Sequence, residues 1–317
     1  NGMKYPLAYI QGPPGTGKTN TIINTIITAF FNERTVLFSS YNNHPINGVF
    51  DKLSNMQYKG KTIPFPVLRL GNIEKTKEAI EYIKRLYLQV KDIKVFEGTL
   101  DRRKDDRTLR AKQLSNLLKK YEEVLELKDR KEAIKQVMDF QNKREVNMQM
   151  LPFQTDLQGR QLSAVKQKIS DIGNITDTDA IELLDSDYEQ FKMYLYYTSA
   201  KYIKKLGDGR NKELYDILFN ENEDTQVESF SKYLSKTDNI KKIQKIFPVI
   251  ITTCISAHKL GEPTPVFDMV IIDEARQGNT AVSLVPIIRG ENLMLVGDPQ
   301  QLNPVILLDE VVNQKLR

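Results

Sequence analysis

Cysteine and histidine are scarce in this sequence. Its 317 residues include one cysteine, Cys254, and two histidines, His44 and His258. A single cysteine excludes an internal disulfide framework, and these three residues are too few to form a structural zinc site. We therefore expect the thiol of Cys254 to pack in a hydrophobic core.

Long apolar runs and a dominant charge of one sign are also absent. No run approaches the roughly 20 apolar residues that a membrane helix requires, and the first residues lack the basic and then apolar pattern of a secretory signal. The net charge is +5, from 46 basic and 41 acidic side chains, so composition alone does not establish a nucleic-acid partner. We expect a cytoplasmic protein with no membrane partner, or a nuclear one if the source is eukaryotic.

A glycine-rich loop follows the first apolar run, Leu7–Ile10. The loop reads Gly-Pro-Pro-Gly-Thr-Gly-Lys-Thr and is followed by an Ile-rich segment with helical spacing. Glycines allow backbone N–H groups to approach the oxygens of a triphosphate, and the helix that follows directs its positive end toward the anion. Lys18 is expected to contact the β- and γ-phosphates, and the Thr19 hydroxyl to bind Mg²⁺. The predicted ATP-binding residues are Gly12, Pro13, Pro14, Gly15, Thr16, Gly17, Lys18 and Thr19.

Short apolar runs alternate with helix-like segments at both ends of the chain. Such runs are typical of strands that are buried on both faces of a parallel sheet. The six runs are Leu7–Ile10, Val36–Phe38, Val67–Leu70, Val249–Ile251, Met269–Ile272 and Leu293–Val296. They predict an α/β fold of the P-loop nucleotide-binding class, with a parallel sheet between helices.

The middle of the chain has a different pattern. Residues 73–246 contain 34 of the 46 Lys and Arg residues and 31 of the 41 Asp and Glu residues. Apolar residues recur there at helical spacing, as at Ile80, Ile83, Tyr87 and Val90. We expect residues 1–72 and 247–317 to form a discontinuous ATP-binding domain. Residues 73–246 then form an all-α insertion, a helical hairpin followed by a smaller helical group.

Two of the apolar runs end in residues suited to catalysis. One leads into Asp273 and Glu274, where Asp273 is expected to hold Mg²⁺ together with Thr19, and Glu274 to polarise the attacking water as a general base. The other leads into Gly-Asp-Pro-Gln-Gln, in which Gln301 is expected to sense the γ-phosphate. Glu274, Gln301 and Lys18 are therefore the candidate catalytic residues.

Three motifs together resemble motifs I, II and III of superfamily 1 helicases. They are the glycine-rich loop, Asp-Glu-Ala-x-Gln at 273–277, and Gly-Asp-Pro-Gln-Gln-Leu-x-Pro-Val at 297–305. They are most similar to superfamily 1B, the branch that contains the nonsense-mediated-decay helicase. The resemblance implies the first RecA-like motor domain of such a helicase, with Gln277 and Asp298 also in the nucleotide site.

Two further segments resemble the family's nucleic-acid contacts. Residues 39–47 are similar to motif Ia, although Pro45 stands where Ala is usual and Asn47 where Asp is usual. Residues 252–254 are similar to motif Ic. The resemblance implies that these loops contact the backbone of single-stranded DNA or RNA. The residues assigned to these contacts are Ser40, Asn42, Asn43, Thr252 and Thr253.

The resemblance implies an ATP-dependent helicase or translocase that moves 5′ to 3′. In the family a second RecA-like domain supplies arginines to the γ-phosphate. This chain ends about fifteen residues after the third motif, so we expect ATP binding with weak hydrolysis. The alternative is a helicase-derived ATP-binding module without motor activity, whose helical insertion docks a partner protein.

Overall fold

The computed structural model of this chain describes residues 5–13, 15–143, 152–173, 178–179, 182, 188–298 and 300. It divides into two compact units, each of which is considered by itself. The sheet unit comprises Asn1–Val95 and Leu195–Arg317, and the helical unit comprises Phe96–Tyr194. Residues 73–95 and 195–246 thus lie in the sheet unit, although they belong to the insertion predicted from the sequence. Compactness alone does not decide where an insertion begins, so the predicted division at 72/73 and 246/247 stays a prediction.

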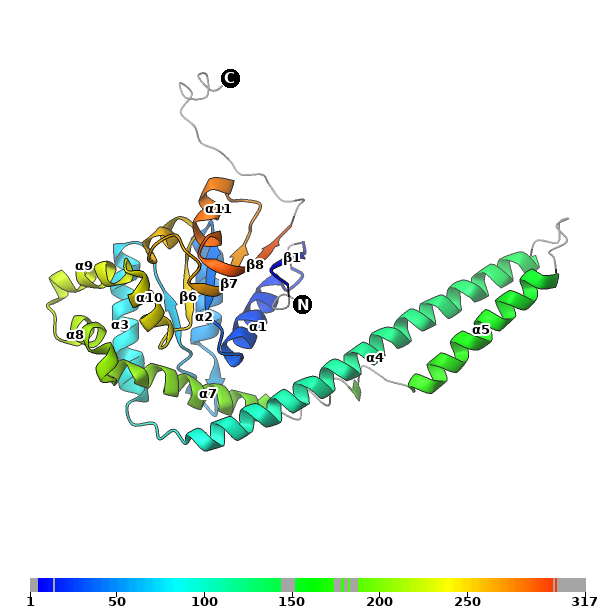
Figure 1. The fold of residues 1–317 in the computed structure, drawn as a ribbon, viewed down its shortest axis with the longest axis horizontal. Coiled ribbons are helices and arrows are strands. Elements are labelled where there is room, and N and C mark those ends of the chain that lie inside the picture. Colours follow the sequence, from blue (N-terminus) through cyan, green and yellow to red (C-terminus); the bar gives the residue numbers. More distant parts are fainter. Residues whose placement is uncertain are drawn as a thin grey trace, which may run out of the picture. The chain divides into compact units, whose positions relative to one another are not determined.

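The sheet unit is built on six parallel strands (Figure 1). Every neighbouring pair is parallel, which confirms the predicted fold class. Across the sheet the strands are β1 (Leu7–Gln11), β8 (Gly290–Gly297), β7 (Phe267–Asp273), β2 (Val36–Ser40), β6 (Val249–Thr253) and β5 (Val67–Arg69). Each coincides with one of the six predicted apolar runs, although β5 ends at Arg69, one residue before its run does. A strand covered on both faces needs apolar residues at successive positions.

Strand β1 differs from the prediction of burial on both faces. Leu7 is 61% exposed and Tyr9 is 53% exposed. Within the described residues β1 pairs only with β8 and lies at the edge of the sheet. An apolar run therefore predicted the strand correctly but not its position at the edge.

Helices connect the strands and cover the sheet. In the sheet unit they are α1 (Lys18–Phe31), α2 (Asn43–Ser54), α3 (Ile73–Val90), α8 (Lys212–Phe219), α9 (Glu223–Leu234), α10 (Thr237–Gln244) and α11 (Thr280–Ile287). A small hairpin of β3 (Gln57–Tyr58) and β4 (Lys61–Thr62) lies between α2 and β5 in the sequence. The 3₁₀ turns are η1 (Lys205–Gly207), η2 (Gly209–Asn211) and η3 (Ile255–Lys259). Helix α7 (Tyr188–Lys204) begins in the helical unit and ends in the sheet unit.

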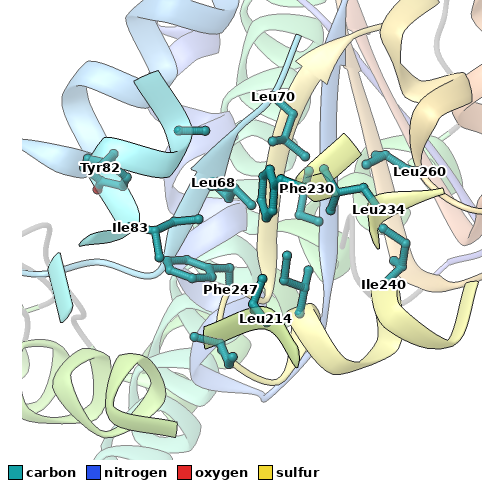
Figure 2. Packing of buried hydrophobic residues seen from close by; sticks show 14 of the residues in the cluster. Leu68, Leu70, Tyr82, Ile83, Leu214, Phe230, Leu234, Ile240, Phe247 and Leu260 are labelled. Atoms are coloured by element: carbon teal, nitrogen blue, oxygen red, sulfur yellow. The ribbon is translucent and has the colours of Figure 1, made fainter. Parts of the chain in front are cut away.

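The main hydrophobic core lies on one face of the sheet. Alternate strand residues such as Leu68 and Ile250 pack there against residues of α3, α8, α9 and α10. Figure 2 shows Ile83, Leu214 and Phe230 gathered around this face. Fully burying an aliphatic or phenyl side chain stabilises a fold by about 1.5–3 kcal/mol. The intervening strand residues are also buried, and α1 contacts β2, so that the sheet has helices on both faces.

The helical unit contains two long helices, α4 (Glu97–Lys143) and α5 (Pro152–Ile172). They lie side by side and antiparallel (Figure 1). On α4, Val124 is fully buried. None of the helices among the described residues is long and apolar enough to cross a membrane.

Candidate active site

The glycine-rich loop connects the end of β1 to the start of α1. Gly15 and Gly17 both have φ of 83°, in the left-handed region where glycine carries no Cβ penalty. Gly12 has a different role, because a Cβ at this position would lie 2.6 Å from Thr16 Oγ1. The glycines therefore permit the loop to turn tightly. Pro14 lies outside the described residues.

Lys18 is the first residue of α1 and its side chain folds back over the loop. Its ammonium donates hydrogen bonds to the carbonyl oxygens of Gly12, at 2.5 Å, and of Pro13, at 3.0 Å. The Thr16 hydroxyl also donates to the Pro13 oxygen, at 2.8 Å. The ammonium thus lies within the loop, where an anion bound by the backbone amides would meet it.

The order of the strands brings the second motif to the same edge of the sheet. Strand β8 lies between β1 and β7, so Gly297 at its end is next to both. The Gly12 amide donates to the Gly297 oxygen at 3.1 Å, and the Ala275 amide donates to the Val296 oxygen at 3.1 Å. The loop and the two carboxylates at the end of β7 are therefore joined through β8. Neither motif by itself specifies this arrangement.

Asp273 is the last residue of β7, and it is only 6% exposed. Burial raises the pKa of its carboxyl, while the Glu274 amide, which donates to Oδ1 at 2.9 Å, and the charge of Lys18 both act to lower it. A nearly enclosed carboxylate of this kind is suited to neutralisation by a cation.

The donors expected for Mg²⁺ fit that ion. The Asp273 carboxylate and the Thr19 hydroxyl are hard oxygen ligands, which Mg²⁺ prefers. Within the described part of the chain there is no cluster of three or more His, Cys, Asp or Glu residues that would form an all-protein metal cage.

Glu274 follows directly at the point where β7 ends. Its φ of 52° lies in the left-handed region, which is unusual for a residue with a side chain. Such conformations cost of order 1–3 kcal/mol and cluster at functional sites. In a regular strand, successive side chains point to opposite faces of the sheet. The turn at Glu274 ends this alternation, so the side chains of Asp273 and Glu274 need not point in opposite directions.

Gln277 and Asp298, the other residues assigned to the nucleotide site, lie on the loops after β7 and β8. The backbone N–H of Gln277 donates to the backbone carbonyl oxygen of Glu274 at 2.9 Å. Asp298 is only 7% exposed, and its Oδ1 accepts from the Gln300 amide at 2.9 Å. Both residues therefore lie in the same group of loops as the carboxylates. Gln301 lies outside the described residues, and its sensing role stays a prediction.

The five predicted nucleic-acid residues fall into two groups. Asn42 and Asn43 are exposed, and Thr253 is partly buried. Ser40 and Thr252 are buried in adjacent strands, and their hydroxyl oxygens have no hydrogen-bond partner in this structure. In the sheet register, Ser40 is paired with Asp273. The strand pairing therefore places Ser40 beside the predicted Mg²⁺ ligand, a position that the motif did not indicate.

The structure also reveals a contact between motifs that the sequence did not suggest. The Asn42 amide nitrogen lies 3.4 Å from Glu274 Oε2 and 3.1 Å from Gln277 Oε1, and donates to both. Asn42 and Glu274 are 232 residues apart in the chain. No local pattern could have found this pair, since it depends on β2 and β7 being neighbours.

Comparison with known protein families gives one match that extends over most of the chain. The AAA domain family model matches residues 3–308. This range contains all the predicted site residues.

Individual relatives include helicases from archaea and eukaryotes. An uncharacterized ATP-dependent helicase of Methanocaldococcus jannaschii is 23% identical over 315 residues, which cover 98% of this chain and 36% of that protein. Regulator of nonsense transcripts 1 of Dictyostelium discoideum is 32% identical over 124 residues, or 36% of this chain and 9% of that protein. RNA helicase Mov10l1 of Mus musculus is 35% identical over 92 residues, or 26% of this chain and 8% of that protein. This chain therefore spans 36% or less of the length of each of these relatives.

Proposed function

Because this chain belongs to the AAA domain family and forms the first motor domain of a superfamily 1B type of helicase, we propose that it binds ATP with Mg²⁺ at the glycine-rich loop. The protein that contains it uses ATP hydrolysis to move along single-stranded DNA or RNA. The observation that carries the proposal is the placement of three residues at one edge of the sheet: Lys18 at the start of α1, Asp273 at the end of β7 and Glu274 directly after it.

In the proposed complex Lys18 exchanges its partners. In this structure its ammonium is held by the carbonyl oxygens of Gly12 and Pro13. Phosphate oxygens are charged acceptors, and hydrogen bonds between charged groups are roughly twice as strong as neutral ones. The β- and γ-phosphates would therefore draw Lys18 from the loop carbonyls. The backbone amides of the loop and of the first turn of α1 would bind the remaining phosphate oxygens.

Mg²⁺, when bound, neutralises charge on the triphosphate, and Thr19 and Asp273 are the residues that would hold it. Glu274 then orients a water molecule and accepts its proton. The water oxygen forms a bond to the γ-phosphorus as the bond to the β–γ bridging oxygen breaks, which yields ADP and phosphate. The Asp273 side chain keeps its place through the Glu274 amide that donates to it.

The proposed movement along a nucleic-acid strand is inferred mainly from the helicase family. We propose 5′ to 3′ movement, a second RecA-like domain that supplies arginines, and weak hydrolysis by this motor domain without that partner. Within motif Ia, the exposed side chains of Asn42 and Asn43 are the better candidates for strand contact, since Ser40 is buried. Contacts of this kind to phosphate and sugar carry no base sequence information.

The test is ATP hydrolysis by the full-length protein, with single-stranded DNA and single-stranded RNA in parallel. Replacing Lys18 by Ala removes the charge that faces the phosphates, and we expect ATP binding weaker by roughly tenfold to a hundredfold. The matched control is Lys77→Ala, because Lys77 is an exposed lysine on α3.

The outcomes distinguish a motor domain from an ATP-binding interaction module. Stimulation by one strand type, lost in Lys18→Ala and kept in Lys77→Ala, supports the motor and identifies its substrate. ATP binding without hydrolysis or strand dependence would instead support the interaction module. Equal ATP affinity in Lys18→Ala and the wild type would contradict the nucleotide site itself.

A further inference from the structure

Ser40 is the last residue of β2, and it is fully buried. Its hydroxyl oxygen has no hydrogen-bond partner in this structure. A hydroxyl buried without a partner costs roughly 1–3 kcal/mol. Alanine fills nearly the same volume and would avoid this cost. A polar group retained in such a place therefore requires an explanation.

The register of the sheet gives Ser40 two neighbours. Strand β2 lies between β7 and β6, and Ser40 is paired with Asp273 on one side and with Thr253 on the other. Paired residues on neighbouring strands project from the same face of the sheet, and such strands lie about 4.8 Å apart. The Ser40 hydroxyl and the Asp273 carboxylate therefore lie on the same face, at a separation that one water molecule can bridge.

The other neighbour of Ser40 is already engaged. The Thr253 hydroxyl donates to Ser256 Oγ at 2.9 Å and accepts from the Ser256 backbone N–H at 3.3 Å, within the turn that follows β6. The backbone of Ser40 is fixed as well, since its carbonyl oxygen accepts from the Cys254 backbone N–H at 3.0 Å. Of the two neighbours, Asp273 is thus the one whose chemistry involves Ser40.

A second serine on the same strand shows that burial alone does not single out Ser40. Ser39 is also fully buried, and its hydroxyl oxygen likewise has no hydrogen-bond partner. Its neighbours in the register are Ile272 and Thr252, and its side chain projects from the opposite face. The two serines are therefore equal in burial but differ in their relation to Asp273.

From this placement we propose that Ser40 is a positioning residue for the magnesium ion of the ATP site, and that its hydroxyl binds a water molecule of the ion's hydration shell. The inference rests on the proposed function. Mg²⁺ keeps several of its waters when it binds to a protein. A water with its oxygen on the cation can donate one hydrogen to the Asp273 carboxylate and the other to the Ser40 oxygen.

This role differs from the strand contact that motif Ia implied for Ser40. A fully buried hydroxyl cannot contact a phosphate or sugar at the surface, whereas it can contact a water enclosed beside Asp273. Residues that hold the groups around a metal affect its affinity without binding the metal themselves. Loss of the Ser40 hydroxyl should therefore weaken ATP binding only when Mg²⁺ is present.

The test is the affinity of the full-length protein for a fluorescent ATP analogue, measured in excess Mg²⁺ and again in EDTA. In Mg²⁺ we expect Ser40→Ala to bind the analogue roughly threefold to tenfold more weakly than the wild type, as for the loss of one hydrogen bond. In EDTA we expect equal affinities. This measurement does not depend on hydrolysis.

The matched control is Ser39→Ala, which removes the same group from the opposite face of β2. We expect the wild-type affinity in both solutions. Without nucleotide, both variants should melt at or above the wild-type temperature, because each loses a buried hydroxyl that has no partner. This stability measurement excludes a general loss of packing in β2.

Three results would overturn the assignment of Ser40. The first is an affinity in Mg²⁺ equal to that of the wild type. The second is an equal loss of affinity in EDTA, together with a lower melting temperature, which would make Ser40 a structural residue. The third is the same Mg²⁺-dependent loss in Ser39→Ala.

Failure of the proposed function gives a different result. A wild-type protein that does not bind the analogue in either solution would contradict the nucleotide site itself. A wild type that binds it more tightly in Mg²⁺, together with a Ser40→Ala variant that gains as much, would leave the nucleotide site standing and refute only the role of Ser40.

Discussion

The sheet unit and the helical unit differ in how they bury their side chains. In the sheet unit the central strands and their covering helices contain many side chains with no exposed surface, among them Phe38, Phe230 and Phe247. Helix α4 has 47 residues, and of its described side chains only Leu100 and Val124 are buried apolar ones. A densely packed core fixes atomic positions, whereas a long exposed helix relies on backbone hydrogen bonds and local propensity.

This difference explains why the candidate site lies on the sheet unit. The carboxylates at the end of β7 and the loop after β1 must keep their separation to within a fraction of an ångström for the proposed catalysis. Strands paired on both sides supply that precision, as β7 does between β8 and β2. Substitutions should therefore have large and specific effects in the sheet unit and small ones on α4 and α5.

The largest expected contrast concerns two glutamates, one in each unit. Glu274→Gln keeps the shape of the side chain but removes the proposed base, and we expect the rate of ATP hydrolysis to fall by about 10²–10⁴. ATP binding should be retained. Glu126→Gln, at an exposed position on α4, should leave the rate as in the wild type. Rates are measured by phosphate release and binding by a fluorescent ATP analogue, and undiminished turnover in Glu274→Gln would refute its assignment as the base.

The next contrast concerns thiol reactivity. Cys254 is 2% exposed, and burial raises its pKa to about 11. A free thiol has a pKa near 8.5, so at pH 8 the thiolate fraction of Cys254 is lower by roughly two-hundredfold. The rate at which Cys254 is alkylated should rise as the pH approaches 11, because the reactive thiolate then forms. A cysteine introduced as Ser115→Cys on the exposed surface of α4 should react rapidly.

Peptide mass spectrometry after iodoacetamide treatment distinguishes the two cysteines in one sample. Equal labelling of Cys254 and the introduced cysteine in the folded protein would contradict the packing of the sheet unit. Labelling of Cys254 that appears only with unfolding would support it.

The smallest expected contrast is in stability. Gly290→Ala in β8 would place a Cβ 2.4 Å from Val270 Cγ2, and overpacking of this kind typically costs about 1–3 kcal/mol. Gly159→Ala in α5 meets no atom within 4 Å and should stabilise its helix by roughly 0.5–1 kcal/mol, since alanine is the better helix former. Chemical denaturation monitored by circular dichroism measures both changes. Loss of stability in Gly159→Ala would contradict the open space around this position in α5.

Much of the fold could be predicted because its signals are local. A short apolar run predicts a strand from local sequence alone, and all six runs proved to lie in strands of the sheet. The glycines and lysine of the loop likewise act within eight consecutive residues. Exposure was less predictable: Tyr9 lies on an edge strand and is exposed, while Ser40 and Thr252 are buried. Burial depends on which elements are neighbours, and residue type alone does not reveal it.

The sequence by itself determined the parts of the candidate site: a glycine-rich loop that contains Lys18, and an apolar run that leads into Asp273 and Glu274. Their chemistry follows from residue type and from spacing along the chain. Only the tertiary structure decided that β8 lies between the two motifs and that Asn42 reaches Glu274. Such contacts join residues far apart in the chain, and they form only when parallel strands align their carboxyl ends along one edge.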